Sequence, residues 1–453
     1  MPFVFYDVET TGLRKRYDQI LTFAAILTDE DLVERDRFEC NCRLMPQVAP
    51  HPAALARNGL TLEDITLPSL RSHYDMACDI ARRLEEWGDA LYIGYNSIAF
   101  DEEFLRQTFY LSLHNPYLTS RPGCGRADVL GLVRTIAFLA PGVVEIPFTG
   151  EGRRSFRLED IAAANGIVHD EAHRAIDDAK AVLDLSRLVR DRDQETWSRF
   201  LKMSTKSAVS ELLDTEDAFL HIGFRGNDAI PRLVTAVASD RNRRLCLPVT
   251  FDAACLDGLD DEAAWTRLGD ATEGMVVVEI NKCPILAPLY DAPDELVALP
   301  NAESLGAALR GNQSLTMRVA ALAERNRPDF SMHRELEDRL YEELPLRQDD
   351  PVKRRFHASN WSERVSLIPA FQDPRARAAA IRIVHAERPD LLSGDDVDRV
   401  RKGIRRRLTE EPGRKAWRTL SAAINGLDEI PHDSRQAMEA AFLAMRDRLI
   451  SGH

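Results

Sequence analysis

The feature that most constrains the fold is an apolar run near the beginning of the chain that leads directly into two acidic residues. Residues 3–13 read FVFYDVETTGL, so a buried strand is predicted ahead of a Thr-Thr-Gly turn. Because strand side chains alternate, Asp7 and Glu9 must project to the same side. Either they are solvated at a strand end, or they share a divalent cation, for which oxygen ligands favour Mg²⁺ or Mn²⁺.

Length and composition place few limits on function. With 453 residues the chain can hold two or three domains, and its hydrophobic content of 44% is that of an ordinary soluble protein. No apolar run reaches the roughly eighteen residues of a transmembrane helix. Because the N-terminus goes straight into the predicted strand, we expect no signal peptide. The net charge of −14 argues against indiscriminate binding of polyanions, so a nucleic-acid substrate would need a local basic groove.

The seven cysteines are scattered along the chain. Only Cys40 and Cys42 are close in sequence, and no second pair or histidine cluster accompanies them to complete a zinc-binding set. We therefore expect reduced thiols in a cytoplasmic protein.

Further strands and an acidic helix start extend the first domain. Residues 20–27 and 32–44 predict strands that neighbour the first in antiparallel order. A later buried strand beginning at residue 91 ends in a Gly-Tyr-Asn turn, and Asp101 stands before a helix predicted for residues 102–110. Asp101 is either the cap of that helix or a catalytic acid, and both roles can coexist because a helix N-terminus favours negative charge.

A histidine and an aspartate introduce another helix, predicted from residue 175 to residue 188. His173 precedes this helix and Asp178 lies in its first turns. Side chains five apart on one helix diverge by about 140°. His173 must therefore come from the loop, and Asp178 from the helix, if both reach one metal site. Upstream, Arg157 lies near the start of another predicted helix, where a positive charge is unfavourable because it opposes the helix dipole. Arg157 therefore either contacts an anion or pairs with a neighbouring acid.

Taken in order, Asp7-x-Glu9, Asp101 after a strand, and His173-x₄-Asp178 resemble the DEDDh group of 3′→5′ exonucleases, which includes proofreading subunits and RNase T. Other stretches are similar to the bacterial exonuclease I family in particular: the Gly-Tyr-Asn turn, SFRLE at 155–159, ANGI at 164–167 and INKCPIL at 280–286. The resemblance is close over residues 1–190, recognisable to about 345 and thin beyond.

The resemblance implies an α/β architecture with three domains. It implies an RNase H-like exonuclease domain at 1–190, an SH3-like β-barrel domain with added helices at 195–345, and a C-terminal helical domain at 347–453. Short apolar runs between residues 219 and 280 agree with strands in the second domain.

The resemblance also implies site roles. The acids Asp7, Glu9, Asp101 and Asp178 would hold two Mg²⁺ ions, with Asp7 bridging them and Mn²⁺ expected to substitute. His173 would be the general base, because an imidazole with a pKa near 6.5 can accept a proton from attacking water. Glu9 would also face the terminal nucleotide, and Arg157 would contact the substrate.

The implied activity is processive 3′→5′ hydrolysis of single-stranded DNA to 5′-mononucleotides, in DNA repair and recombination. Two alternatives stay open, a DEDDh exonuclease that acts on RNA or mixed 3′ ends and a non-catalytic nucleic-acid-binding scaffold. The scaffold predicts at least one missing site residue, whereas all five positions are occupied.

Expected partners are single-stranded DNA and, through the family, the C-terminal tail of single-strand-binding protein. We expect a monomer that does not associate with membranes and lies in the bacterial cytoplasm, with the nucleoid when on DNA. The basic runs at residues 353–355 and 399–407 are either solvated helix faces or one wall of a single-strand channel. Lys282 either touches a phosphate or belongs to a structural turn.

Overall fold

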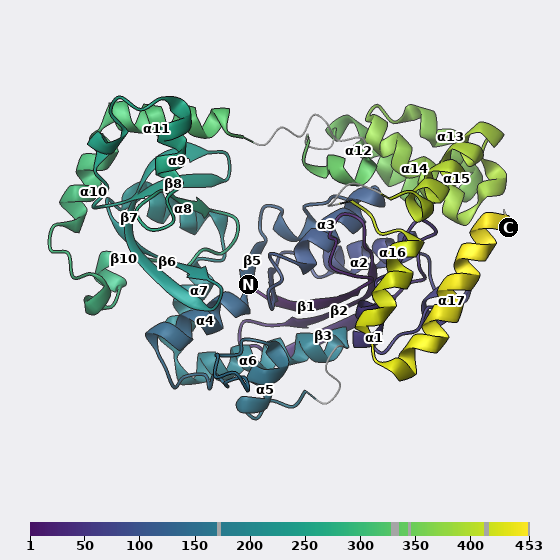
Figure 1. Ribbon diagram of the computed structural model, residues 1–453, viewed down its shortest axis with the longest axis horizontal. Coiled ribbons are helices and arrows are strands. Elements are labelled where there is room, and N and C mark those ends of the chain that lie inside the picture. The colour runs from purple at the N-terminus through teal and green to yellow at the C-terminus, as the bar shows by residue number, and fades with distance from the viewer. Residues whose placement is uncertain (170–173, 328–334, 343–345, 412–415, 452–453) are drawn as a thin grey trace.

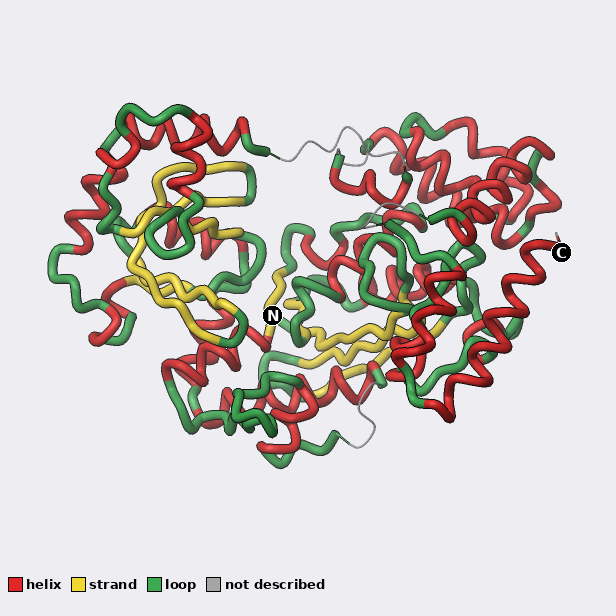
Figure 2. The backbone as a smooth tube through the Cα atoms, viewed as in Figure 1, coloured by secondary structure: helices red, strands yellow, loops and turns green. Residues whose placement is uncertain are grey.

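The computed structural model describes residues 1–169, 174–327, 335–342, 346–411 and 416–451. Figures 1 and 2 show a central part that mixes strands and helices, a second part built on another sheet, and a C-terminal group of helices. The second part and the C-terminal helices lie on opposite sides of the first sheet, left and right in Figure 1. This arrangement confirms the predicted α/β class with a helical C-terminal region.

The first sheet places the acidic strand at its centre. Its order is β3-β2-β1-β4-β5, with β1 antiparallel to β2 and parallel to β4. The strands are β1 (Phe3–Thr10), β2 (Ile20–Thr28), β3 (Glu34–Asn41), β4 (Leu91–Gly94) and β5 (Gly125–Asp128). The antiparallel arrangement predicted for the first three strands is confirmed. The sequence analysis missed β5, since this strand is short and lacks an apolar run.

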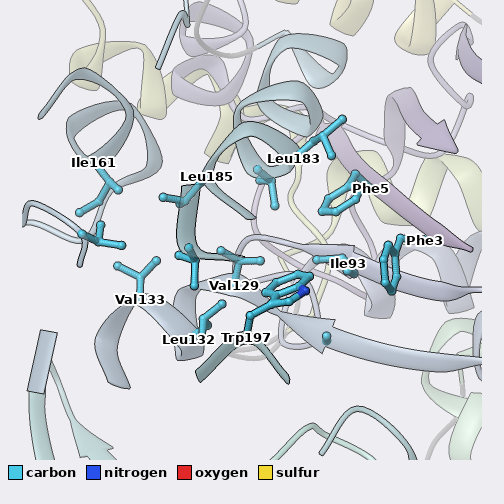
Figure 3. Close-up of a cluster of buried hydrophobic side chains, with 14 of the residues drawn as sticks. Phe3, Phe5, Ile93, Val129, Leu132, Val133, Ile161, Leu183, Leu185 and Trp197 are labelled. Carbon is cyan, nitrogen blue, oxygen red and sulfur yellow. The ribbon is translucent and has the colours of Figure 1, made fainter. Parts of the chain in front are cut away.

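Alternate side chains of β1 pack into two separate hydrophobic cores, one on each face of the sheet. Phe3 and Phe5 pack on one face of the sheet with the helices α4 (Val129–Leu139), α5 (Leu158–Ala164), α6 (Ala175–Arg192) and α7 (Gln194–Lys202), as Figure 3 shows. Val4 and Tyr6 pack on the other face with α2 (His73–Glu86) and α3 (Asp101–Leu111). Asp7 and Glu9 continue the Phe3 side, so they face the layer that contains α6.

The second part is built on a five-stranded antiparallel sheet. Its order is β10-β6-β7-β8-β9. The elements are α8 (Lys206–Thr215), β6 (Phe219–Arg225), β7 (Asp228–Asp240), β8 (Arg243–Pro248), α9 (Asp261–Leu268), β9 (Val276–Glu279), β10 (Leu286–Pro288), α10 (Ala302–Gly311) and α11 (Gln313–Arg325). The predicted strands are present. The SH3-like barrel type and the three domain boundaries stay predictions.

The stretch INKCPIL at residues 280–286 connects this sheet to the first domain. Arg126 of β5 donates to the Asn281 carbonyl at 2.5 Å. Cys283 packs against the core that contains Phe3 and Phe5. The stretch that resembles exonuclease I therefore joins the two parts.

The C-terminal helices share cores with the first domain. They are α12 (Asp350–Ala358), α13 (Trp361–Leu367), α14 (Pro374–Glu387), α15 (Gly394–Thr409), α16 (Leu420–Asn425) and α17 (His432–Ser451). Leu420 and Phe442 lie in one buried cluster with Leu21 of β2 and Leu55 of α1 (Pro52–Arg57). This packing ties the last helices to the sheet. Within the described ranges, no helix combines the length and apolar character needed to cross a bilayer.

The basic run at 399–407 contains both residues that pair within the fold and residues that are exposed on the surface. Arg407 is buried and pairs with Glu337, and Arg406 pairs with Glu335 at 2.5 Å. Arg401 and Lys402 are exposed. Part of the run therefore stabilises the fold, and a channel wall would have to use the remainder.

Candidate active site

Four predicted acids line one pocket. Asp7 and Glu9 lie on β1, Asp101 is the first residue of α3, and Asp178 is in the first turn of α6. Carboxylate oxygens of Asp7, Glu9 and Asp178 lie within 4.8 Å of one another. Asp101 lines the same pocket, whose volume is about 530 Å³. Three elements distant in sequence thus converge on one acidic site.

Asp101 is held by the strand that carries the other acids. The N-cap of α3 is Phe100, with no side-chain cap, so the expectation that Asp101 caps this helix is wrong. Instead the Val8 backbone N–H donates to Asp101 Oδ1 at 3.2 Å, and Asp101 is only 4% exposed. This bond sets the carboxylate of Asp101 beside Asp7 and Glu9.

Burial and mutual repulsion raise the pKa values of these acids. Burial, then the charges of Asp101, Asp178 and Glu9, raises the pKa of Asp7 well above its ordinary value. Burial, then Asp178 and Asp101, raises the pKa of Glu9 to about 8. Burial raises the pKa of Asp101 to about 8, although hydrogen bonds from backbone N–H groups oppose the shift. Bringing these charges together is therefore costly without a cation.

The donor set fits a hard divalent cation. The four carboxylates offer oxygen ligands, the type that Mg²⁺ and Mn²⁺ prefer. Among the described residues that line the pocket, Arg57 is the only lysine or arginine, and it also lies 3.9 Å from Glu159. Its positive charge lowers the pKa of Asp7 and Glu9 against the larger raising effects. The single positive charge of Arg57 cannot neutralise four carboxylates, so the pocket can accept the positive charge of a metal ion.

A histidine that the sequence analysis missed contacts the last acid. His169 Nε2 lies 2.5 Å from Asp178 Oδ1, and the two side chains are 6% and 16% exposed. His173 lies outside the described residues, so its predicted place at the pocket is untested. The spacing His-x₃-His-x₄-Asp is visible in the sequence and could have drawn attention to His169.

Arg157, the predicted substrate contact, and Lys282, for which the sequence leaves open a phosphate contact or a structural turn, each pair with an acid. Arg157, whose side chain is 61% exposed, pairs with Glu159 and is not among the described residues that line the pocket. Lys282 pairs with Glu279 at 2.8 Å. Both pairings agree with the structural alternatives. A substrate contact by Arg157 stays a prediction.

The turn after Glu9 is closed by the C-terminal region. Asp18 accepts hydrogen bonds from the Arg14 backbone at 2.8 Å and from Arg418 Nη1 at 2.8 Å. A Cβ atom at Gly12 would lie 2.5 Å from Asp18 Oδ2 and 2.9 Å from Arg418 Nη2, so only glycine fits there. Glu429, also from the C-terminal region, lines the pocket. The last helices therefore help to shape the site.

We expect the metal-free protein to be less stable at pH 8 than at pH 6. The folded pKa values of Glu9 and Asp101 are about 8, above ordinary values near 4. The folded state thus binds more protons than the unfolded state between these pKa values. The free energy of unfolding therefore falls as the pH rises from about 4 through 8. A change of 1 kcal/mol in the free energy of unfolding moves the melting temperature of a large domain by roughly 2–4 °C. Because these acids carry fewer protons at pH 8, we expect Mn²⁺ to raise the melting temperature by several degrees more at pH 8 than at pH 6.

Differential scanning fluorimetry in EDTA and in Mn²⁺ measures these melting temperatures. The matched control is the Asp7→Asn/Glu9→Gln variant, for which the gain from Mn²⁺ should become small and nearly independent of pH. An equal Mn²⁺ gain in parent and variant would place the stabilising ion elsewhere.

Comparison with known proteins agrees with this geometry. A family model described as "Exonuclease" matches residues 4–186, which contain all four acids. The exodeoxyribonuclease I of Haemophilus influenzae is 28% identical over 305 residues, covering 63% of this chain and 64% of that protein. The match thus spans slightly less than two thirds of this relative's length.

Solved structures show the same fold over almost the whole chain. Exonuclease I from Methylocaldum szegediense has a TM-score of 0.83 at 23% identity, with 99% of each chain covered. Escherichia coli exonuclease I in complex with a dA16 oligonucleotide has a TM-score of 0.82 at 22% identity, again with 99% of each chain covered. The E. coli protein has also been solved as a complex with single-stranded DNA in a zinc-bound form.

Proposed function

Because a family model described as "Exonuclease" matches residues 4–186, we propose that this protein is a 3′→5′ exonuclease that degrades single-stranded DNA and depends on divalent metal ions. The observation that carries the proposal is the convergence of Asp7, Glu9, Asp101 and Asp178 on one pocket. Their similarity in order to the DEDDh exonucleases supports the reaction type. The exonuclease I relatives and their DNA complexes support the substrate.

Two Mg²⁺ ions are the cofactors that we propose for this pocket. Asp7, Glu9, Asp101 and Asp178 would hold them, with Mn²⁺ as a substitute. When bound, such a pair of ions supplies charge neutralisation of the phosphodiester and stabilisation of the leaving oxygen. The oxygen-only donor set and the raised pKa values of Asp7 and Glu9 support this assignment.

The chain's own residues orient the acids. Asp7 and Glu9 are fixed by the pairing of β1 with β2, Asp101 by the Val8 N–H, and Asp178 by His169. A rigid set of ligands matters because small displacements of reacting groups cost large factors in rate. The Glu9 carboxylate faces the pocket that would receive the terminal nucleotide.

The base that accepts the proton of the attacking water is, in this proposal, His173. We expect His173→Ala to lower the turnover number by roughly 10²–10⁴-fold while the affinity for Mn²⁺ stays close to that of the parent. Single-turnover digestion and calorimetric Mn²⁺ titration measure the two effects. His169→Gln is the comparison, because His169 contacts Asp178 and should mainly weaken Mn²⁺ binding. A parental rate for His173→Ala would remove this residue from the base role.

End-labelled oligonucleotides test the proposed activity. A 5′-labelled single strand should give a ladder that shortens from the 3′ end, a 3′-labelled strand should release labelled mononucleotide at once, and both should require Mg²⁺. A matched RNA strand should be digested more slowly, since the 2′-hydroxyl distinguishes the two substrates. Faster digestion of RNA would favour the alternative substrate class, and binding without digestion would favour a scaffold.

We also propose finer features that rest on the resemblance to the exonuclease I family alone. They are processive digestion, a role in DNA repair and recombination, a monomeric state, the tail of single-strand-binding protein as a partner, and a cytoplasmic location. Analytical ultracentrifugation would test the monomeric state. Titration with a peptide of the single-strand-binding-protein tail would test that partner.

A further inference from the structure

A second group of potential metal ligands lies away from the acidic pocket. Cys78 of α2, His114 just after α3, and His357 of α12 each place a ligand atom within 4.8 Å of the other two. The three residues are far apart in the sequence, so the sequence analysis found no histidine cluster near any cysteine. All seven cysteines, Cys78 included, are free thiols, as predicted.

The distances within this cluster agree with one zinc ion. Cys78 Sγ lies 3.4 Å from His114 Nε2 and 3.8 Å from His357 Nδ1. In a tetrahedral site with Zn–S of about 2.3 Å and Zn–N of about 2.0 Å, sulfur and nitrogen ligands stand about 3.5 Å apart. A set of one thiolate and two imidazoles also binds zinc in preference to Mg²⁺, which prefers oxygen ligands.

The surroundings of His357 prepare it as a ligand. Its Nε2 lies 3.4 Å from the Leu113 carbonyl oxygen, which can only accept a hydrogen bond. Donation from Nε2 leaves the Nδ1 lone pair directed at Cys78 and at Tyr74 Oη, 2.9 Å away. A backbone carbonyl that holds the second ring nitrogen is the usual support of a metal-bound histidine. Tyr74, one turn before Cys78 on α2, also offers an oxygen donor close to the three ligands.

The two imidazoles lie close together in the present arrangement. The two rings are stacked, with centroids 4.0 Å apart and planes inclined by 11°. A tetrahedral ion needs converging lone pairs, so the rings must turn out of this stack when metal binds.

We propose that Cys78, His114 and His357 form a zinc site that fastens the C-terminal helices to the exonuclease domain. The site spans an interface that is already apolar, because Tyr74 and Leu113 share a buried cluster with Phe356 of α12. Zinc at this place would add a bond between α2 and α12 that hydrophobic packing alone does not supply. Its role is structural, since the ligands lie outside the residues that line the acidic pocket.

Metal content and cobalt spectra test the proposal. The experiment uses the full chain as the Asp7→Asn/Asp178→Asn variant, which removes acidic ligands that could also retain zinc. After loading with Zn²⁺ and gel filtration, we expect one zinc ion per chain by mass spectrometry, and none after a further Cys78→Ser exchange. Co²⁺ in place of Zn²⁺ should give a thiolate-to-cobalt charge-transfer band that Cys78→Ser abolishes.

Cys124→Ser is the matched control, because Cys124 is another half-buried thiol outside the cluster. It should retain both the zinc and the cobalt band. X-ray absorption at the zinc edge of the Asp7→Asn/Asp178→Asn variant needs no substitution within the cluster, and should show one sulfur ligand and two imidazoles. Zinc lost on gel filtration, no sulfur at the metal, or a cobalt band that survives Cys78→Ser in folded protein would each overturn the proposal.

Discussion

Replacing Asp7 by asparagine is expected to reduce Mg²⁺-dependent digestion of single-stranded DNA by at least about 10³-fold. The charges of Asp101, Asp178 and Glu9 all raise the pKa of Asp7, and Asp7 shares one pocket with these three acids. Metal-ion catalysis contributes several kcal/mol of transition-state stabilisation, and each 1.36 kcal/mol is about tenfold in rate. The measurement is single-turnover release of mononucleotides with enzyme in excess over a 5′-labelled strand.

Asp177→Asn is the matched control for this experiment. Asp177 is adjacent to Asp178 on α6 but lies 3.7 Å from Arg174 and is not among the described residues that line the pocket. We expect nearly parental digestion and an unchanged melting temperature. If Asp7→Asn also retained a rate within tenfold of the parent, the four carboxylates could not be the centre of the reaction.

Replacing Arg418 by alanine is expected to destabilise the protein by about 3–5 kcal/mol. The Arg418 and Asp18 side chains are only 5% and 3% exposed, so the change would leave Asp18 as a buried charge without its partner. Arg418 also donates to the Ala49 carbonyl at 3.0 Å, and that acceptor would lose its bond. Chemical denaturation, with the midpoint and slope fitted separately, measures the loss.

Two further variants separate the buried pair from a general effect of lost charge. Arg388→Ala removes an arginine whose pair with Asp390 is 45% and 59% exposed, so we expect a free energy of unfolding close to that of the parent. Asp18→Asn/Arg418→Met removes both charges and should recover much of the stability lost in Arg418→Ala. If Arg418→Ala cost no more than Arg388→Ala, the buried pair would not hold the turn in place.

The acidic site was accessible to sequence reasoning because its residues stand at element boundaries. Asp7 and Glu9 follow four apolar residues, and period-two alternation is enough to place them on one face. Asp101 and Asp178 each stand at the start of a helix, where a short local pattern marks the position. Local patterns did not show the Val8 N–H that anchors Asp101, since that bond joins residues 93 apart.

The parts that sequence reasoning missed depend on contacts between distant segments. The strand β5 has a polar sequence and exists because β4 offers a parallel partner. The C-terminal helices appear in the sequence as basic amphipathic segments, and their packing against Leu21 and Leu55 cannot be read from any local period. The cluster of Cys78 and His357 likewise joins residues 279 apart.

The bond between Asp18 and Arg418 has a consequence for how the protein is made. Its two ends are separated by 400 residues, and a ribosome adds residues in order. While the chain is being synthesised, Asp18 has to remain hydrated and the glycine turn beside Glu9 lacks its cover. The acidic pocket therefore reaches its final shape late, after the last helices of the chain have been synthesised.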